Sequence, residues 1–242
     1  MARRIQACLN GARARGFHPR LPLSAAELAA DAAACAAAGA IAFHIHPRDA
    51  AGKETLEAAV VGEAVAALRA AAPGLPVSVS TGDWIEQDDA RQIAALRSWG
   101  SLPLIARPDE ASVNLSEPTA RDAMAALLSV GIGVEAGLAS VADAERLLQL
   151  GLLPRCRRVL VEMDDVEPAT AAAVAGSILA LLGEGRGPER QLHGFGRSAW
   201  PMAMRAIEAG LMLRLGLEDV VELPDGRLAL DNAALVLAGM AL

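Results

Sequence analysis

The chain of 242 residues alternates short apolar runs with longer amphipathic stretches, eight times over. Such alternation is typical of β-α units repeated around a parallel sheet. Strands are expected at residues 5–9, 40–44, 76–80, 111–114, 133–135, 158–162, 191–195 and 211–215. Helices are expected from Ser24 and over residues 56–71, 87–97, 119–129, 141–150, 168–182, 199–208 and 230–241. The pattern predicts an α/β protein with one domain over residues 1–242, a (β/α)8 TIM barrel.

Capping residues mark several helix boundaries. Ser24 can accept hydrogen bonds from the free amides at a helix start, and Glu27 can reach back to it, which makes a capping box. Glycine stops helices because it adopts the left-handed conformation without steric cost. It follows four of the expected helices, at Gly39, Gly131, Gly151 and Gly210.

A doubly wound open sheet is the alternative fold. No GxGxxG motif follows the first expected strand, however, and Gly194-Phe195-Gly196-Arg197 alone is a weak phosphate-binding signal. No linker rich in Pro, Ser or Gly divides the sequence. We interpret residues 183–190 as a surface turn before the seventh strand, without a domain boundary.

The charge balance of 22 Lys+Arg against 29 Asp+Glu disfavours nucleic-acid binding, although a local basic patch stays open. Cys8, Cys35 and Cys156 are odd in number and lie in or beside apolar segments, so reduced, buried thiols are expected. The apolar run before Asn10 is too short for a signal peptide, and no uncharged stretch reaches the roughly 20 residues of a membrane span. We therefore expect a cytoplasmic protein.

The segment His44-Ile45-His46-Pro47-Arg48-Asp49 follows the apolar run Gly39 to Phe43, at the end of the second expected strand. Alternate side chains of a strand share one face, so His44 and His46 can turn both imidazoles toward one point. Catalytic zinc takes three protein ligands of the His, Asp, Glu or Cys type and keeps one position open. The pair therefore indicates two ligands of a metal ion, and the alternative is two polar residues at a strand end.

Polar residues gather at the expected C-terminal ends of the strands, where the chemistry of such barrels takes place. Taken singly, each has a plain structural explanation, such as a solvated carboxylate or a turn serine. Together, one at the end of every strand, they indicate a site. They are Asn10, His44, His46, Ser80, Thr81, Asn114, Glu135, Glu162, His193, Arg214, Glu218 and Asp219.

Glu218 is the natural third metal ligand, because the loop after the eighth strand lies across the barrel mouth from the second strand. Its neighbour Asp219 cannot point at the same spot, so it is available as a base. Arg214 offers a planar fork that suits a carboxylate. A metal, a base and a carboxylate clamp suit proton removal from the carbon next to a carbonyl.

This pattern resembles the β-keto acid cleavage enzymes, whose best-described member is the 3-keto-5-aminohexanoate cleavage enzyme. The matches run in family order over nearly the whole chain. They are Asn10-Gly11-Ala12, His44 to Asp49, Ser80-Thr81-Gly82, Ser112-Val113-Asn114, Gly194 to Arg197, Arg214-Leu215-Gly216-Leu217-Glu218-Asp219, Gly226 and Asn232-Ala233.

The resemblance implies a zinc-dependent, homotetrameric barrel that converts a β-keto acid and acetyl-CoA into acetoacetate and a new acyl-CoA. It implies zinc ligation by His44, His46 and Glu218, with Asp219 as the base, assisted by Arg214 and Ser80. The substrate-binding residues would be Asn10, Arg13, Ser112, Asn114 and Glu135.

The chain departs from the family pattern at a few positions. The aminohexanoate enzyme resembles Gly-Ala-Glu after the first strand, and Arg13 of this chain stands at the position of that glutamate. We therefore expect a substrate with a neutral or anionic tail. The segment Met163-Asp164-Asp165-Val166-Glu167-Pro168 is short and acidic where the family usually has a glycine-bearing loop. Val220 replaces a common asparagine, and the chain is shorter than is usual.

Two other functions fit parts of the pattern. Metal-dependent hydrolases on barrels also begin with His-x-His, but they need further histidines, and of the four here His193 alone is suitably placed. A barrel that binds a small acid without converting it is the non-enzymatic alternative. Zinc content of the purified protein would separate this last function from the other two.

Overall fold

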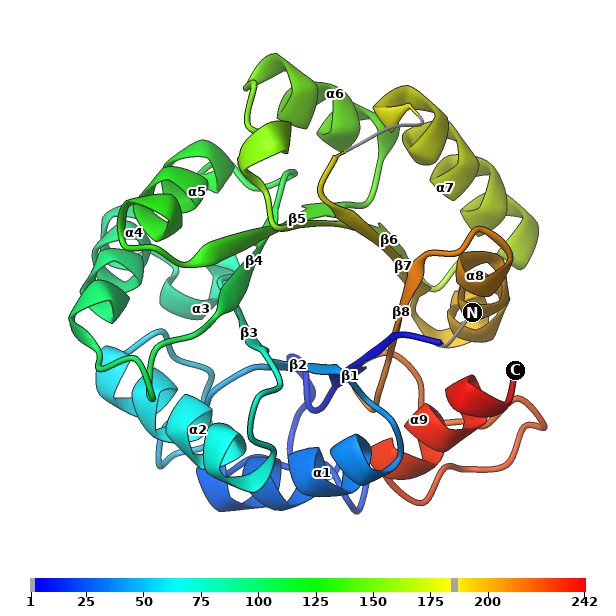
Figure 1. The fold of residues 1–242 in the computed structure, drawn as a ribbon, viewed down its shortest axis with the longest axis horizontal. Coiled ribbons are helices and arrows are strands. Elements are labelled where there is room, and N and C mark those ends of the chain that lie inside the picture. Colours follow the sequence, from blue (N-terminus) through cyan, green and yellow to red (C-terminus); the bar gives the residue numbers. More distant parts are fainter. Residues whose placement is uncertain (1–2, 184–186) are drawn as a thin grey trace.

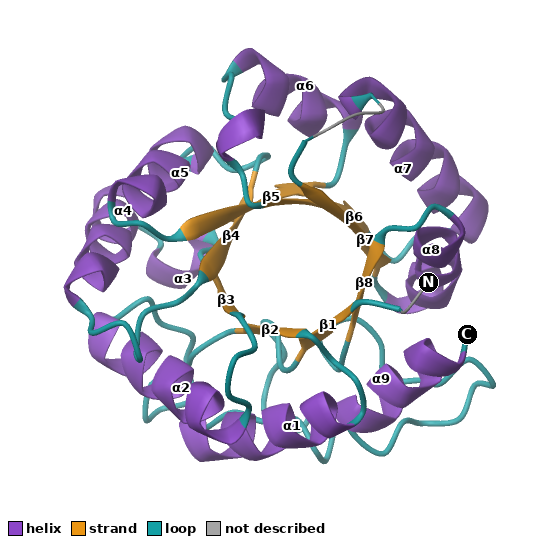
Figure 2. Ribbon diagram, viewed as in Figure 1, coloured by secondary structure: helices purple, strands orange, loops and turns teal. Residues whose placement is uncertain are grey.

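Eight parallel strands close into a barrel, and helices surround it as an outer ring (Figure 1, Figure 2). This computed structural model describes residues 3–183 and 187–242, so the expected turn at 183–190 lies partly outside the described residues. The strands are β1 (Ile5–Cys8), β2 (Ala42–Ile45), β3 (Val77–Ser80), β4 (Glu110–Asn114), β5 (Gly133–Leu138), β6 (Arg158–Met163), β7 (Glu189–Gly194) and β8 (Met212–Leu215). The expected TIM barrel is confirmed.

The barrel closes because β1 pairs with both β2 and β8. Cys8 of β1 lies opposite His44 of β2, and Ala7 lies opposite Leu215 of β8. This closure brings residues from the two ends of the chain to the same side of the barrel mouth. The segment after β2 and the loop after β8 therefore become neighbours through β1.

The helices are α1 (Ala25–Ala37), α2 (Ala58–Ala71), α3 (Asp83–Glu86), α4 (Asp89–Ser98), α5 (Ala120–Ser129), α6 (Val141–Gln149), α7 (Pro168–Leu182), α8 (Ala199–Glu208) and α9 (Asn232–Ala241). Short 3-10 turns cover Trp99–Ser101, Leu153–Arg155 and Gly196–Ser198. The capping box of α1 is present: the amide of Glu27 donates to Ser24 Oγ at 3.2 Å, and the amide of Ser24 donates to Glu27 Oε2 at 2.9 Å. Gly39, Gly131, Gly151 and Gly210 all have positive φ after their helices, as expected.

The helix expected over residues 87–97 is present as α4, which begins two residues later, and the short α3, which was not expected, precedes it. The chain forms the short α3, turns at Gln87 with a φ of 53°, and begins α4 after Asp88. Asp88 causes the second start, because its side chain accepts a hydrogen bond from the amide of Arg91 at 2.8 Å. The short α3 matters for the site because it carries Trp84, whose ring stacks on the ring of His46.

The apolar core lies between the strands and the helices, where Phe43, Trp99 and Leu127 are fully buried. The barrel interior below the mouth is polar instead. Arg158 donates to Glu110 at 2.9 Å and to Glu189 at 3.0 Å, and it also binds Glu135. Paired charges of this kind can be buried because each keeps hydrogen-bond partners.

Two further expectations concern the surroundings of the protein. Cys8, Cys35 and Cys156 are free and buried, as expected. Among the helices of the described residues, none combines the length and the apolar character that crossing a bilayer requires.

Candidate metal centre and active-site cavity

His44 is the last residue but one of β2, with its side chain on the inner face of the barrel, and His46 directly follows the strand. Both are almost fully buried, with exposed fractions of 1% and 4%. Their Nε2 atoms lie 3.2 Å apart, and the rings meet nearly edge to face. The two imidazoles therefore converge on one point, as the alternation of the strand predicts.

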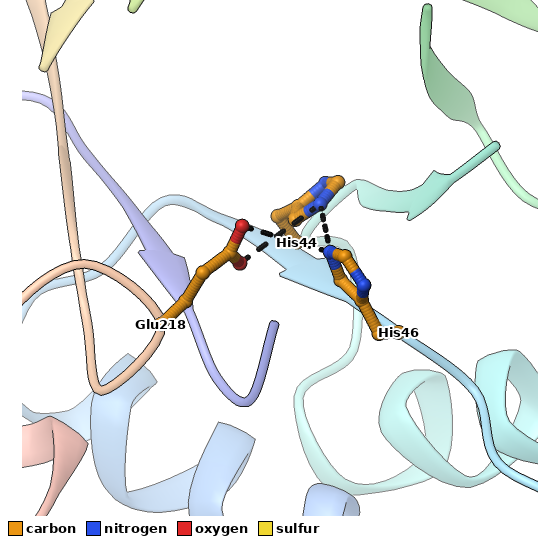
Figure 3. A group of neighbouring side chains, drawn as sticks. All are labelled: His44, His46 and Glu218. Carbon is orange, nitrogen blue, oxygen red and sulfur yellow. Dashed lines mark hydrogen bonds and ion pairs between the residues drawn. The ribbon is translucent and has the colours of Figure 1, made fainter. Parts of the chain in front are cut away.

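Glu218 reaches the same point from the loop after β8 (Figure 3). The loop passes so close to β1 that a Cβ on Gly216 would stand 1.9 Å from the carbonyl oxygen of Cys8. Glu218 Oε2 lies 4.0 Å from His44 Nε2, and Glu218 Oε1 lies 3.6 Å from His46 Nε2. Because the loop lies against β1 at Gly216, the carboxylate of Glu218 can reach the two histidines on the other side of β1.

These three donors fit a zinc ion. Zinc bonds of 2.0–2.2 Å in a tetrahedron separate the ligand atoms by roughly 3.3 Å, and the three distances here run from 3.2 to 4.0 Å. Glu218 Oε2 is also buried without a hydrogen-bond partner among the described residues, which a cation would provide. His44, His46 and Glu218 therefore form a buried group that can hold a metal ion.

Ser78 and Glu135 orient the ring of His44 from below. His44 Nδ1 lies 3.2 Å from Ser78 Oγ, and the Ser78 hydroxyl donates to a carboxylate oxygen of Glu135. The serine hydroxyl has one proton, which it gives to Glu135, so it can accept the Nδ1 proton of His44. This arrangement leaves His44 Nε2 free to bind a metal.

Glu54, Trp84 and Asn10 hold His46. Glu54 Oε1 accepts from His46 Nδ1, and Glu54 Oε2 accepts from Trp84 Nε1 at 3.2 Å. The Trp84 ring also stacks on the His46 ring, with centroids 6.5 Å apart. Asn10 makes two bonds of 2.9 Å to the backbone of His46, one to its carbonyl and one from its amide. These contacts fix both the ring and the backbone of His46.

The electrostatics of the two histidines differ. Burial and the neighbouring Arg214 guanidinium lower the pKa of His44 to about 3, so this ring is neutral. Burial also acts to lower the pKa of His46, but the carboxylates of Glu218 and Glu54 outweigh it and raise the pKa to about 9. Burial opposes ionisation of Glu218, yet Arg214 and the two imidazoles hold its pKa well below the ordinary value.

A cavity of about 430 Å³ opens beside the three donors at the barrel mouth. It is lined by most of the residues that the sequence indicated, and these are Arg13, His44, His46, Ser80, Ser112, Asn114, Glu162, Arg214 and Glu218. The structure adds Trp84, Leu160 and Phe195 to the lining, together with Asp164 and Asp165 of the acidic segment after β6. Charged groups of both signs thus surround one small cavity.

Glu135 does not lie at the strand end, as the sequence analysis expected. β5 runs three residues further, to Leu138, so Glu135 is inside the strand. It is fully buried, outside the cavity lining, and accepts from Gln6 at 3.0 Å, from Ser78 and from Arg158. Its contacts support His44 rather than face a substrate. Asn10 likewise holds the backbone of His46 and does not line the cavity.

Asp219 is close to the cavity but does not line it. Its side chain is fully buried, 3.4 Å from His193 Nδ1 and 3.9 Å from Arg214 Nε. His193 Nε2 in turn lies 2.9 Å from a carboxylate oxygen of Glu162. Because His193 is held between these two carboxylates, it does not join the metal group, and the hydrolase alternative lacks a further histidine ligand among the described residues.

Glu54, Trp84 and Ser78 are site residues that the sequence analysis missed. Glu54 and Ser78 lie away from the expected strand ends, and Trp84 lies in α3, a short helix that the sequence analysis did not expect. One signal pointed to Ser78: it alternates with Ser80 on β3, so both occupy the same inner face. Nothing local in the sequence connects Glu54 with His46.

Three solved structures with similar folds are distant from this chain in sequence. The apo structure of ObcA superimposes with a TM-score of 0.67 at 16% identity, covering 90% of this chain and 61% of ObcA. The ternary complex of ObcA with a C4-CoA adduct and oxalate gives 0.70 at 16% identity, covering 90% and 62%. A type I 3-dehydroquinate dehydratase from Clostridium difficile gives 0.65 at 10% identity, covering 95% and 88%. The chain spans less than two thirds of the length of ObcA.

At such identities these similarities show the barrel fold alone. The family evidence comes from the sequence itself, because a family model described as beta-keto acid cleavage enzyme matches residues 4–241. This match includes every residue of the metal group and of the cavity lining. The chain belongs to the β-keto acid cleavage enzyme family.

Proposed function

We propose that this protein is a zinc-dependent β-keto acid cleavage enzyme, which converts a β-keto acid and acetyl-CoA into acetoacetate and a new acyl-CoA. The observation that carries the proposal is the convergence of His44, His46 and Glu218 at the wall of the cavity at the barrel mouth, in a chain of this family. A zinc ion bound there supplies a Lewis acid that polarises the keto oxygen and acidifies the adjacent carbon.

Arg214 and Ser80 assist the reaction at the cavity wall. The Arg214 guanidinium binds Glu218 and lies near Asp219, and it faces the cavity as a buried cation. Burial acts to lower the pKa of Arg214, but the surrounding anionic groups raise it well above the ordinary value, so the charge is permanent. Arg214 can therefore hold the substrate carboxylate, with the Ser80 hydroxyl as a further donor.

Arg13 selects the substrate tail. Its guanidinium donates twice to the carbonyl oxygen of Glu218, at 2.9 and 2.7 Å, and lies 4.5 Å over the ring of Phe17. This fixed cation at the cavity repels an ammonium group and accommodates a neutral or anionic tail. Ser112 and Asn114 line the cavity on β4 and offer hydrogen bonds to the same tail.

Acetyl-CoA is the second substrate of the proposed reaction. ObcA, with a barrel of the same fold, has been solved with a C4-CoA adduct and oxalate. In the present chain Asp164 and Asp165 make one side of the cavity acidic, and Asp165 is paired with Arg197 at 2.9 Å. The phosphates of CoA would therefore lie away from the segment after β6, on the side of Arg13.

The experiment combines a metal measurement with an assay on defined acids. Zinc-loaded protein is incubated with acetyl-CoA and 3-oxopentanoate, 3-oxopentanedioate or 3-oxo-5-aminohexanoate, and acetoacetate is measured by mass spectrometry. We expect acetoacetate from the neutral or anionic acid, and its loss with zinc content in His44→Ala. No acetoacetate from any acid, in protein that retains zinc, would overturn the proposal.

We also propose that the protein assembles as a homotetramer in the cytoplasm. Leu228, Leu230 and Leu237, on α9 and the loop before it, are 60%, 73% and 56% exposed, and burial of such side chains drives association. The free, buried thiols agree with a reducing compartment. Light scattering on the eluting protein measures the assembly, and a monomeric mass would contradict it.

A further inference from the structure

The polar interior of the barrel contains a run of hydrogen bonds that ends at the candidate metal centre. Arg158, at the start of β6, donates to one carboxylate oxygen of Glu135, and Ser78 of β3 donates to the other. Ser78 Oγ in turn lies 3.2 Å from His44 Nδ1. Arg158, Glu135, Ser78 and His44 thus form one relay from the start of the strands to a metal ligand.

The strand register and deep burial hold the relay in place. His44 of β2 is paired directly with Ser78 of β3, and Glu135 of β5 is paired directly with Arg158 of β6. The exposed fractions of Arg158, Ser78 and Glu135 are 3%, 1% and 0%. Bulk water does not reach these groups, so each proton in the relay has to be placed by a neighbouring side chain.

Glu135 acts only as an acceptor. Its Oε1 accepts from Arg158 and from Gln6 Nε2 at 3.0 Å, and its Oε2 accepts from Ser78. Burial acts to raise the pKa of Glu135, but the charge of Arg158 is the largest opposing effect and lowers the pKa to about 2. An ionised carboxylate has no proton to donate. The Ser78 hydroxyl must therefore direct its single proton to Glu135.

The direction of the Ser78 hydroxyl decides the ring proton of His44. A hydroxyl that donates to Glu135 can only accept from the imidazole, so the ring proton belongs on His44 Nδ1. The other ring nitrogen then keeps its lone pair. That nitrogen, Nε2, lies 3.2 Å from His46 Nε2 and 4.0 Å from Glu218 Oε2, so its lone pair faces the metal position.

We propose that Arg158 is a positioning residue for the metal centre, because its charge fixes which nitrogen of His44 carries the ring proton. This inference rests on the zinc ion of the proposed function, although not on the substrates. Without the guanidinium, Glu135 takes up a proton from solvent and donates it to Ser78 Oγ. The Ser78 hydroxyl can then donate to His44 Nδ1, which loses its proton to solvent while Nε2 gains one. A protonated Nε2 cannot bind zinc.

Arg157 supplies a matched control. Arg158 also donates to Glu110 at 2.9 Å and to Glu189 at 3.0 Å, and Arg157 donates to the same Glu110 at 2.6 Å. The Arg157 side chain is 59% exposed, and among the described residues it makes no bond to Glu135. Arg157→Met therefore removes an equal charge from a shared partner and leaves the relay complete.

The first measurement is the tautomer of His44 in metal-free wild-type protein. The chain has four histidines, and the signal lost in His44→Ala belongs to His44. Solid-state NMR on protein with nitrogen-15 only at Nδ1, or only at Nε2, of its histidines separates protonated from unprotonated nitrogens. We expect a protonated Nδ1 and an unprotonated Nε2. The reverse pattern would overturn the inference, and this result needs no variant of Arg158 to fold.

The second measurement is zinc affinity from chelator competition. Arg158→Met should bind zinc about 10-fold or more weakly, as expected for a lost outer contact of a ligand, and Arg157→Met should stay close to wild type. Ser78→Ala interrupts the relay, so in that background Arg158→Met should change the affinity by about twofold at most. An equal loss in both backgrounds would show that Arg158 acts only through general destabilisation, which would overturn the inference.

A companion variant separates a folding defect from the proposed role. Arg158→Met leaves buried carboxylates without their cation, which destabilises a folded protein. If it does not fold, Glu110→Gln is added to remove one of those carboxylates, and the zinc comparison is made against Glu110→Gln alone.

The possible failures are distinguishable. Wild-type protein that binds no zinc would overturn the proposed function, whereas the His44 tautomer is measured without metal and tests the relay by itself. Wild-type zinc affinity in a folded Arg158→Met would overturn the role of Arg158 alone.

Discussion

Gly11 lies directly against the side chain of Glu218, so closely that a Cβ at position 11 would stand 2.4 Å from Glu218 Cγ. Gly11 also has a φ of +54°, in the left-handed region that favours glycine. The loop after β1 therefore packs against the side chain of Glu218, which comes from the loop after β8. The placement of this candidate metal ligand therefore depends on the absence of a side chain at position 11.

Gly11→Ala should therefore lower zinc affinity by about 100-fold or more, because Glu218 must move away from the two histidines. It should also cost roughly 1–2 kcal/mol of folding free energy from backbone strain. Gly74→Ala is the control, since Gly74 has a φ of +83° with nothing within 4 Å of an added Cβ. Zinc competition and denaturant unfolding measure both effects. Equal zinc affinity in the two variants would contradict the prediction.

Glu54→Gln should weaken zinc binding by roughly 10-fold. Glu54 uses both oxygens, one for His46 Nδ1 and one for Trp84 Nε1. Glutamine has a single acceptor oxygen and no charge, so one of the two donors loses its partner. Glu57→Gln, an exposed residue at the start of α2, serves as the control. Zinc affinity from chelator competition decides, and an unchanged value in Glu54→Gln would refute the orienting role.

Arg13→Glu should invert the preference for the substrate tail. The variant places an anion where the cation at the cavity repels ammonium groups. We expect the ratio of kcat/KM for 3-oxo-5-aminohexanoate over 3-oxopentanedioate to rise by about 10-fold or more. Arg15→Glu, a change of the same charge on an exposed residue outside this cavity, should leave the ratio unchanged. The prediction fails if Arg13→Glu keeps the wild-type ratio.

Asp31→Asn tests a partly buried carboxyl outside the lining of the cavity at the barrel mouth. Burial raises the pKa of Asp31 from 3.8 to about 7, although Asn232 donates to it at 2.6 Å. The folded state binds the proton more tightly than the unfolded state, so stability falls as pH rises from about 4 to about 7. Asparagine does not titrate, so the variant does not lose stability in this way. Relative to wild type, its free energy of unfolding should be higher at pH 8 than at pH 5 by about 1 kcal/mol.

Urea unfolding at the two pH values measures the Asp31 effect. Glu145→Gln, an exposed change of the same charge in α6, should show no such difference. A gain for Asp31→Asn that is equal at both pH values would show that the carboxyl is not the cause.

The barrel and the metal ligands were predictable because they rest on local patterns. Apolar runs and capping residues such as Ser24 act within a few neighbouring residues, so they show in the sequence at once. His44 and His46 share a face because of strand alternation, and Glu218 is placed by the rule that barrel loops meet at one mouth. In a barrel of repeated β-α units, the order of a strand in the sequence gives its position around the barrel.

The remainder of the site was decided by tertiary structure. Strand β5 runs on to Leu138, which moves Glu135 below the mouth, and the unexpected helix α3 carries the Trp84 that contacts Glu54 and His46. Whether Asp219 or Glu162 meets the cavity depends on which side chain the packed interior covers. The sequence by itself determined the kinds of donor and their strand ends. Only closure of the barrel decided which of them touch, because contacts between distant segments depend on packing that no local pattern records.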